Sequence, residues 1–299
     1  MKATYEFRVL EEFAPLLFEP SEGKRLGETV RKVEIEASDP RFDAIGKLQA
    51  EIQAKSDRSF FYGWNIRRRY AQSELQSAKL FHFTVVSTFE PSGEECGTTY
   101  DTSTECPHCH AGASQSSSLI LNIKKIPKHK DFCRTIADEN LVSRKVADLF
   151  AKHGITGAIF RPIYPKRSLN AASQDYFQLV VPEIGAEIVA PTIVGVDPFD
   201  SDSKGEFRCP YGDLLGLNLL SEVTIDFATI PEADIFLTRQ FLGMRRGLLR
   251  PEREILISPK LWRLIVSEKL KGYEVEVAQL EPLSMKAGDD KGANQPSNS

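Results

Sequence analysis

The chain has 299 residues, a hydrophobic fraction of 41%, a charged fraction of 27% and a formal net charge of −4. These values suit a folded protein of about two domains and exclude nucleic-acid binding through overall positive charge. No apolar signal segment follows Met1, and no apolar run reaches the ~20 residues of a membrane span. We therefore expect a cytoplasmic protein without membrane partners, whose five cysteines are reduced and available to bind a metal.

The first 90 residues are typical of an α+β module. Residues 7–10 and 32–35 alternate as strands, and a helix with apolar residues at spacings of three and four follows Pro40. A second helix is predicted over about residues 69–79, and a strand over residues 81–86.

Residues 91–118 contain three cysteines and two histidines among Gly, Ser and Thr, without any periodicity. A loop of this length is uncommon unless a bound group organises it or it is disordered. The polar loop 197–205 lacks the glycine and terminal glutamate spacing of a calcium loop, so we interpret it as a solvated linker. The tail 284–299 has no apolar face and is predicted to be disordered. Further strands are predicted at 119–123, 177–181, 187–189 and 193–196.

Two segments, 141–160 and 256–277, share one pattern. A single constant shift aligns Ser143 with Ser258 and Gly157 with Gly272. Each segment predicts a short strand, a helix capped by the serine, a glycine turn and a final strand. The sequence thus predicts an α+β fold of two modules with short mixed sheets and a cysteine knuckle between them. The expected divisions are 1–90 (N-terminal module), 91–168 (knuckle and first unit), 169–283 (second module) and 284–299 (tail).

The motif Cys106-Pro107-His108-Cys109 carries chemistry of its own. Two thiolates three positions apart can face one ion, and a tetrahedral structural zinc site needs two further ligands. The candidates are Cys96, His108, His110 and Cys209, the last of which begins Cys209-Pro210-Tyr211-Gly212. Two other interpretations compete: a vacant site of buried cysteines, and a redox pair. The flanks of the motif lack the hydrophobic strand and good helix of a thioredoxin-type redox site.

Two basic runs, Arg67-Arg68-Arg69 and residues 124–130, could contact phosphate. In an acidic chain we interpret them as solvated or salt-bridged faces, and we do not expect nucleic acid as a partner. The sequence has no phosphate-binding glycine loop, no Gly-x-Ser-x-Gly elbow and no His-Glu-x-x-His motif.

The order of these pieces resembles the double-CXXCG-motif proteins, a bacterial family that includes immunity proteins of myxobacterial contact-dependent toxin systems. The resemblance covers about residues 96–280: a first cysteine knuckle, a strand–helix–Gly–strand unit, a second knuckle and a second unit. Two positions depart from the family pattern, because His110 follows the first knuckle in place of glycine and Gly212 replaces the last cysteine. The resemblance carries over Cys106, Cys109 and Cys209 as zinc ligands. Proximity in the sequence adds Cys96, or else His110, as the fourth.

The resemblance implies a non-enzymatic, protein-binding immunity protein that occludes the active surface of a cognate bacterial toxin and contains a structural zinc ion. The first rival is a zinc-knuckle protein that binds nucleic acid through the basic runs. The second rival is a thiol oxidoreductase that uses Cys106. Neither the identity of the partner nor the oligomeric state follows from the sequence.

Overall fold

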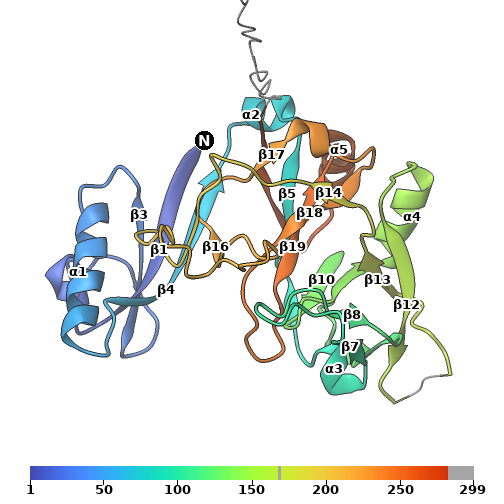
Figure 1. The fold of residues 1–299 in the computed structure, drawn as a ribbon, viewed down its shortest axis with the longest axis horizontal. Coiled ribbons are helices and arrows are strands. Elements are labelled where there is room, and N and C mark those ends of the chain that lie inside the picture. Colours follow the sequence, from blue (N-terminus) through green and yellow to red (C-terminus); the bar gives the residue numbers. More distant parts are fainter. Residues whose placement is uncertain (168–169, 282–299) are drawn as a thin grey trace, which may run out of the picture.

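The computed structural model describes residues 1–167 and 170–281. This part of the chain is an α+β protein with several short mixed sheets, as predicted (Figure 1). No helix in it is long and apolar enough to cross a membrane. The predicted disordered tail, 284–299, lies outside the described residues.

The helices are α1 (Phe42–Lys55), α2 (Gln72–Ser77), α3 (Gly93–Cys96), α4 (Arg144–Lys152) and α5 (Pro259–Ser267). The strands are β1 (Lys2–Leu10), β2 (Lys24–Arg25), β3 (Val30–Glu36), β4 (Phe61–Arg69), β5 (Phe81–Val85), β6 (Thr88–Phe89), β7 (Tyr100–Asp101), β8 (Ser114–Gln115), β9 (Leu119–Leu121), β10 (Phe132–Thr135), β11 (Asn140–Ser143), β12 (Ile159–Pro165), β13 (Tyr176–Val180), β14 (Ile184–Ala186), β15 (Val194–Gly195), β16 (Asn218–Leu219), β17 (Thr224–Asp226), β18 (Ile235–Leu242), β19 (Glu252–Ile257), β20 (Tyr273–Val277) and β21 (Gln279–Glu281).

Residues 1–69 form the N-terminal module, which lies to one side of the rest of the chain in Figure 1, whereas α2 packs through Leu75 against the core of that rest. Its antiparallel sheet has the order β2-β3-β1-β4, and α1 packs on one face. Alternate positions of β1, such as Phe7 and Val9, point into the core, where they meet Ile45 of α1. The second helix, α2, is shorter than the predicted 69–79 because β4 continues to residue 69.

A loop between β15 and β16 inserts Phe199 into this module. The ring centroid of Phe199 lies 4.8 Å from that of Phe42 and 5.8 Å from that of Phe7. Gly46 makes the space, since a Cβ there would lie 2.6 Å from the Phe199 ring. The interpretation of residues 197–205 as a solvated linker is therefore wrong, because one aromatic side chain anchors this polar loop.

Substitution Phe199→Ala should lower the free energy of unfolding by about 2 kcal/mol, below the usual range for phenylalanine because the side chain is only partly buried. Urea denaturation measures this loss. The matched control is Phe227→Ala, which removes a ring that is 58% exposed and should cost less than about 0.5 kcal/mol. Equal losses in the two variants would show that the Phe199 contact does not hold the module.

Beyond α2 the chain is built twice, as a first half (residues 80–167) and a second half (residues 170–281). One sheet contains the order β10-β11-β13-β12, and the other contains the matching order β18-β19-β5-β20. The predicted repeats are β11-α4-β12 and β19-α5-β20. Their helices are capped as predicted: Ser143 accepts from the N–H of Val146, and Ser258 from the N–H of Leu261.

The halves exchange one strand each. Strand β5 belongs to the first half, yet it pairs with β19 and β20 of the second half. Strand β13 belongs to the second half, yet it pairs with β11 and β12 of the first half. The registers correspond, with His82 opposite Leu256 in one sheet and Gln178 opposite Leu141 in the other. The change from the first sheet to the later sheets therefore falls between β4 and β5, and the predicted units on either side of residue 168 interlock.

The glycine turn of each repeat packs against the other half. A Cβ on Gly157 would lie 2.0 Å from the carbonyl oxygen of Ile235, and one on Gly272 would lie 2.0 Å from the carbonyl oxygen of Phe132. Both glycines have positive φ, of 91° and 101°. Only glycine allows this close approach of two backbones in this conformation.

Two aspartates tie these turns to the helix caps. Each one accepts from the capping serine of its own half and from a backbone N–H in the glycine turn of the other half. The contacts are Asp131 with Ser143 Oγ and Lys271 N–H, and Asp234 with Ser258 Oγ and Thr156 N–H. The two halves are thus joined by equivalent hydrogen bonds in both directions.

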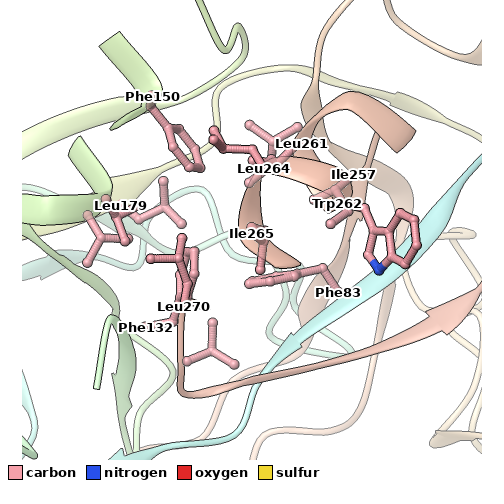
Figure 2. Packing of buried hydrophobic residues seen from close by; sticks show 14 of the residues in the cluster. Phe83, Phe132, Phe150, Leu179, Ile257, Leu261, Trp262, Leu264, Ile265 and Leu270 are labelled. Atoms are coloured by element: carbon pink, nitrogen blue, oxygen red, sulfur yellow. The ribbon is translucent and has the colours of Figure 1, made fainter. Parts of the chain in front are cut away.

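A shared core fills the space between the two sheets. Figure 2 shows Phe150 and Leu179 near Leu264 and Leu270, in the same cluster of buried side chains. The core draws on α4, α5 and both exchanged strands. Because burying apolar surface is the main favourable contribution to folding, we expect the halves to form one cooperative body.

Candidate metal centre

Three of the predicted ligands meet where the halves adjoin. Cys106, Cys109, Cys209 and Asp213 each place a ligand atom within 4.8 Å of the others; we call this group the clasp. The Sγ atoms of Cys106 and Cys209 are 3.6 Å apart, and Cys209 Sγ lies 3.7 Å from Asp213 Oδ2. The first half thus supplies two groups and the second half supplies the other two.

Neither predicted fourth ligand belongs to the clasp. Cys96 ends α3 and is buried elsewhere, where burial raises the pKa of its thiol. The Nδ1 atom of His110 lies 3.5 Å from a carboxylate oxygen of Glu105, and the histidine also stands outside the group. The carboxylate that lies beside the three thiols comes instead from Asp213 of the other half.

The two Cys-Pro knuckles are closed by the same kind of backbone hydrogen bond. The N–H of Cys106 donates to the carbonyl of Ala111, and the N–H of Cys209 donates to the carbonyl of Leu214. Each bond spans the same number of residues and closes a compact loop around its cysteine. The sequence motif therefore closes a loop of the same length twice, although only the first copy has both cysteines.

The residue with left-handed backbone conformation comes one position sooner after the first cysteine in the second knuckle than in the first knuckle. In the first knuckle His110 has φ 58° and donates its N–H to the carbonyl of the first cysteine; in the second, Gly212 has φ 81° and makes the same bond. Gly212 therefore takes the backbone role of His110 rather than that of Cys109. The next residue, Asp213, supplies the carboxylate, and its place directly after the glycine was the available sequence signal.

The surroundings of the thiols differ between the knuckles. Burial raises the pKa of Cys109 to about 12. Burial also opposes ionisation of Cys209, but the backbone N–H groups of Tyr211 and Asp213 hold the pKa of its thiol below the usual value. The rings of His108 and Tyr211 meet edge to face, with centroids 4.8 Å apart, so the knuckles also touch through their third positions.

The donor set suits a zinc ion. Thiolates favour zinc, copper(I) and iron–sulfur clusters, and zinc also accepts a carboxylate oxygen within a tetrahedral set of four. Three sulfurs and one oxygen are the set that Cys106, Cys109, Cys209 and Asp213 would offer. An ion here would link the two halves at a second point, outside the cluster of buried residues that forms their shared apolar core.

Ion pairs of Glu105 with two arginines of the second half hold the first knuckle in place. Glu105 is only 7% exposed, and its Oε2 accepts from Arg245 at 2.9 Å. Arg250 approaches the same carboxylate at 3.7 Å and lies over the ring of Tyr100. Both arginines come from the segment between β18 and β19, so the second half also holds the first knuckle from outside.

A cavity of about 390 Å³ adjoins the clasp and lies between the halves. Corresponding positions of the exchanged strands and their ends line it: Phe83 and Val85 from β5, Leu179 from β13, and Val181 directly after β13. Its charged lining includes Arg134, Asp138 and Glu252. Pockets of this size at a junction between structural units are common ligand sites.

Two carboxyl groups in the cavity share one arginine. Arg134 Nη1 lies 2.8 Å from Asp138 and 3.7 Å from Glu252. Burial raises the pKa of Asp138. Burial and the charge of Asp138 raise the pKa of Glu252 well above its usual value.

The folded chain therefore binds protons at this pair more tightly than the unfolded chain does, so the free energy of unfolding falls as the pH rises through the carboxyl range. Glu252→Gln should raise that free energy at neutral pH by about 1 kcal/mol at most, because Glu252 is 37% exposed and solvent screens the repulsion. Below the ordinary glutamate pKa of 4.5 the gain should vanish. Denaturation at a series of pH values checks the sign, and a loss of stability at neutral pH would contradict it.

The chain matches no protein-family model and no curated protein sequence. The likeness to the double-CXXCG-motif proteins therefore rests on the order of its knuckles and repeats.

Proposed function

We propose that this chain is a non-enzymatic, protein-binding protein whose halves are held together by a structural zinc ion. The observation that carries the proposal is the clasp, in which Cys106 and Cys109 face Cys209 and Asp213 within 4.8 Å. Three thiolates and a carboxylate repel one another at such distances, and a divalent cation offsets that repulsion. The ion fixes the geometry of the surface that the two halves present.

The proposed partner is a cognate bacterial toxin, and the proposed action is occlusion of its active surface. The support is the order of motifs shared with the double-CXXCG-motif proteins, together with the meeting of the two knuckles. Binding through a preformed surface needs a rigid scaffold, which the interlocked sheets provide.

Co-expression tests this function. The small protein encoded beside this chain should arrest growth of a bacterial host when produced alone, and co-production of this chain should restore growth. Purified together, the two should elute as one complex. Cys209→Ser should weaken the rescue, whereas Cys96→Ser, the same change outside the clasp, should retain it. A harmless neighbour, or a toxic one that neither binds this chain nor loses toxicity, would refute the proposal.

The alternative hypothesis of nucleic-acid binding is weakened because part of the basic run 67–69 is paired with carboxylates. Arg67 pairs with Glu6 at 3.1 Å, and Arg68 pairs with Glu276 at 2.7 Å. The Arg68 side chain is only 6% exposed, so this part of the run has a structural role. The rival predicts retention on immobilised RNA or DNA that falls steeply with added salt.

Alkylation distinguishes the alternative hypothesis of a thiol oxidoreductase from that of a zinc site. A redox-active Cys106 would react quickly with iodoacetamide at neutral pH. A zinc ligand would be protected until a chelator removes the ion. Mass spectrometry of the alkylated peptide, run with and without chelator, distinguishes the two.

A further inference from the structure

We propose that the clasp is also a redox site, in which an oxidant of the peroxide class joins Cys106 to Cys209 in a disulfide. The disulfide links the two halves covalently and displaces the zinc ion. Cys209 is the sulfur that the second half contributes to the clasp, and its Sγ atom lies 3.6 Å from that of Cys106. The inference concerns the same four groups as the proposed zinc site, but disulfide formation needs the thiols alone and can be tested without the ion.

Contacts within the protein hold the two sulfurs opposite each other. The backbone N–H of Cys106 and that of Cys209 each donate to a carbonyl of the same knuckle. Glu105, directly before the first of these cysteines, pairs with Arg245 of the second half at 2.9 Å. Because a disulfide bond is about 2 Å long, a closing movement of roughly 1.5 Å brings the two sulfurs to bonding distance.

The chemistry balances with hydrogen peroxide as the oxidant. One thiolate attacks a peroxide oxygen, so that an S–O bond forms, the O–O bond breaks and hydroxide leaves. The other thiolate then attacks this sulfur: the S–S bond forms, the S–O bond breaks and a second hydroxide leaves. The two sulfurs together lose the two electrons that the peroxide gains. Cys106 and Cys209 are only 9% and 8% exposed, which favours a small oxidant such as hydrogen peroxide over a bulky disulfide reagent.

Formation of the disulfide removes two of the four ligands. Cys109 and Asp213 remain, and two groups are too few for a structural zinc site. The ion is therefore released as the covalent link forms, so that one connection between the halves replaces the other. Cys109 is left as a partly exposed free thiol, which makes it the residue whose reactivity reports the change.

The link should be reversible. In a reducing compartment, the disulfides that do form are usually transient and redox-sensing. The remaining cysteines, Cys96 and Cys133, are buried outside the clasp, so they do not exchange with the disulfide in the folded chain. Reduction therefore restores all three thiols of the clasp, which can bind the ion again.

Peroxide oxidation of the full chain tests the proposal on zinc-loaded and on metal-free, reduced protein. A chromogenic chelator measures released zinc, and mass spectrometry of peptides prepared without reductant locates the disulfide. In the zinc-loaded chain we expect one zinc released for each link between Cys106 and Cys209, labelling of Cys109 by iodoacetamide only after oxidation, and reversal by dithiothreitol. In the metal-free chain the same link should form and raise the melting temperature.

Variants assign the effect to the clasp. Cys209→Ser should abolish both the link between the halves and the gain in melting temperature on oxidation. Cys96→Ser, the same change at a buried cysteine outside the clasp, should retain both. The unsubstituted chain already locates the disulfide, so the assignment does not depend on how well either variant folds.

Three results would overturn the proposal: a disulfide between Cys106 and Cys109 within the first knuckle, a disulfide between two chains, or oxidation of the thiols to sulfinic acid without any link. None of them affects the toxin co-expression test. The metal-free chain decides the question of the disulfide even if no zinc binds, so the two proposals can fail separately.

Discussion

Replacing Gly272 by alanine should lower the free energy of unfolding by about 4 kcal/mol or more, which is exceptional for one methyl group. The added Cβ would lie 2.0 Å from the carbonyl oxygen of Phe132, and φ at this position is +101°. The oxygen belongs to the backbone and the backbone fixes the position of the Cβ, so the clash cannot be relieved by a side-chain rotation. It forces the glycine turn of the second half away from the first half. Gly157→Ala should be equally damaging, because it would meet the carbonyl oxygen of Ile235 at the same distance.

The control for both variants is Gly154→Ala. Gly154 also has positive φ, at +58°, but nothing lies within 4 Å of a Cβ built there. Its loss should reflect backbone conformation alone, about 1 kcal/mol. Chemical denaturation followed by circular dichroism measures all three variants. Similar losses at positions 154 and 272 would show that contact between the halves contributes little.

Removal of the metal should have the second largest effect. Zinc present at a thousand times its dissociation constant stabilises a folded chain by about 4 kcal/mol, and a chelator should abolish this contribution. Thermal unfolding with and without chelator gives the measurement. The Cys209→Ser variant should start from a lower melting temperature and respond little to the chelator. An unchanged melting temperature of the natural chain after chelation would contradict a structural ion at the clasp.

The sequence predicted the local features of the repeats well. Ser143 and Ser258 cap helices, and Gly157 and Gly272 turn the chain, as the aligned pattern required. Such features depend on residues close together in sequence, where capping chemistry and backbone freedom act directly.

The exchange of β5 and β13 could not be predicted in this way. Alternation identifies a strand and its buried face, but it does not say which of two similar sheets the strand joins. Each sheet has an equivalent position for the exchanged strand, between β11 and β12 in one and between β19 and β20 in the other. The order of the chain alone would place β5 in the sheet of its own half. The predicted division at residue 90 assigns residues 81–86 to the N-terminal module, whereas β5 pairs with β19 and β20.

The clasp was predicted only in part. The spacing of Cys106 and Cys109 and the proline after Cys209 marked the knuckles, and these three thiols do come together. Asp213 was not predicted as the fourth group because the turn of the second knuckle is one residue shorter. The ligand position of Cys109 in the first knuckle is therefore taken by the aspartate that follows Gly212. Phe199 was missed for a related reason: one aromatic residue in an acidic loop has no periodicity to reveal that it packs against a distant module.

Titration of the metal-free chain with cobalt(II) tests the clasp most directly, because cobalt(II) takes the same tetrahedral sites as zinc and absorbs visible light. The account predicts one equivalent bound per chain, thiolate charge-transfer absorption from three sulfurs, and strong visible bands of a tetrahedral ion. Asp213→Ala should weaken binding and alter the visible bands, while Cys96→Ser should change neither. Absence of thiolate absorption, or a spectrum that depends on Cys96 and not on Cys209, would contradict the account.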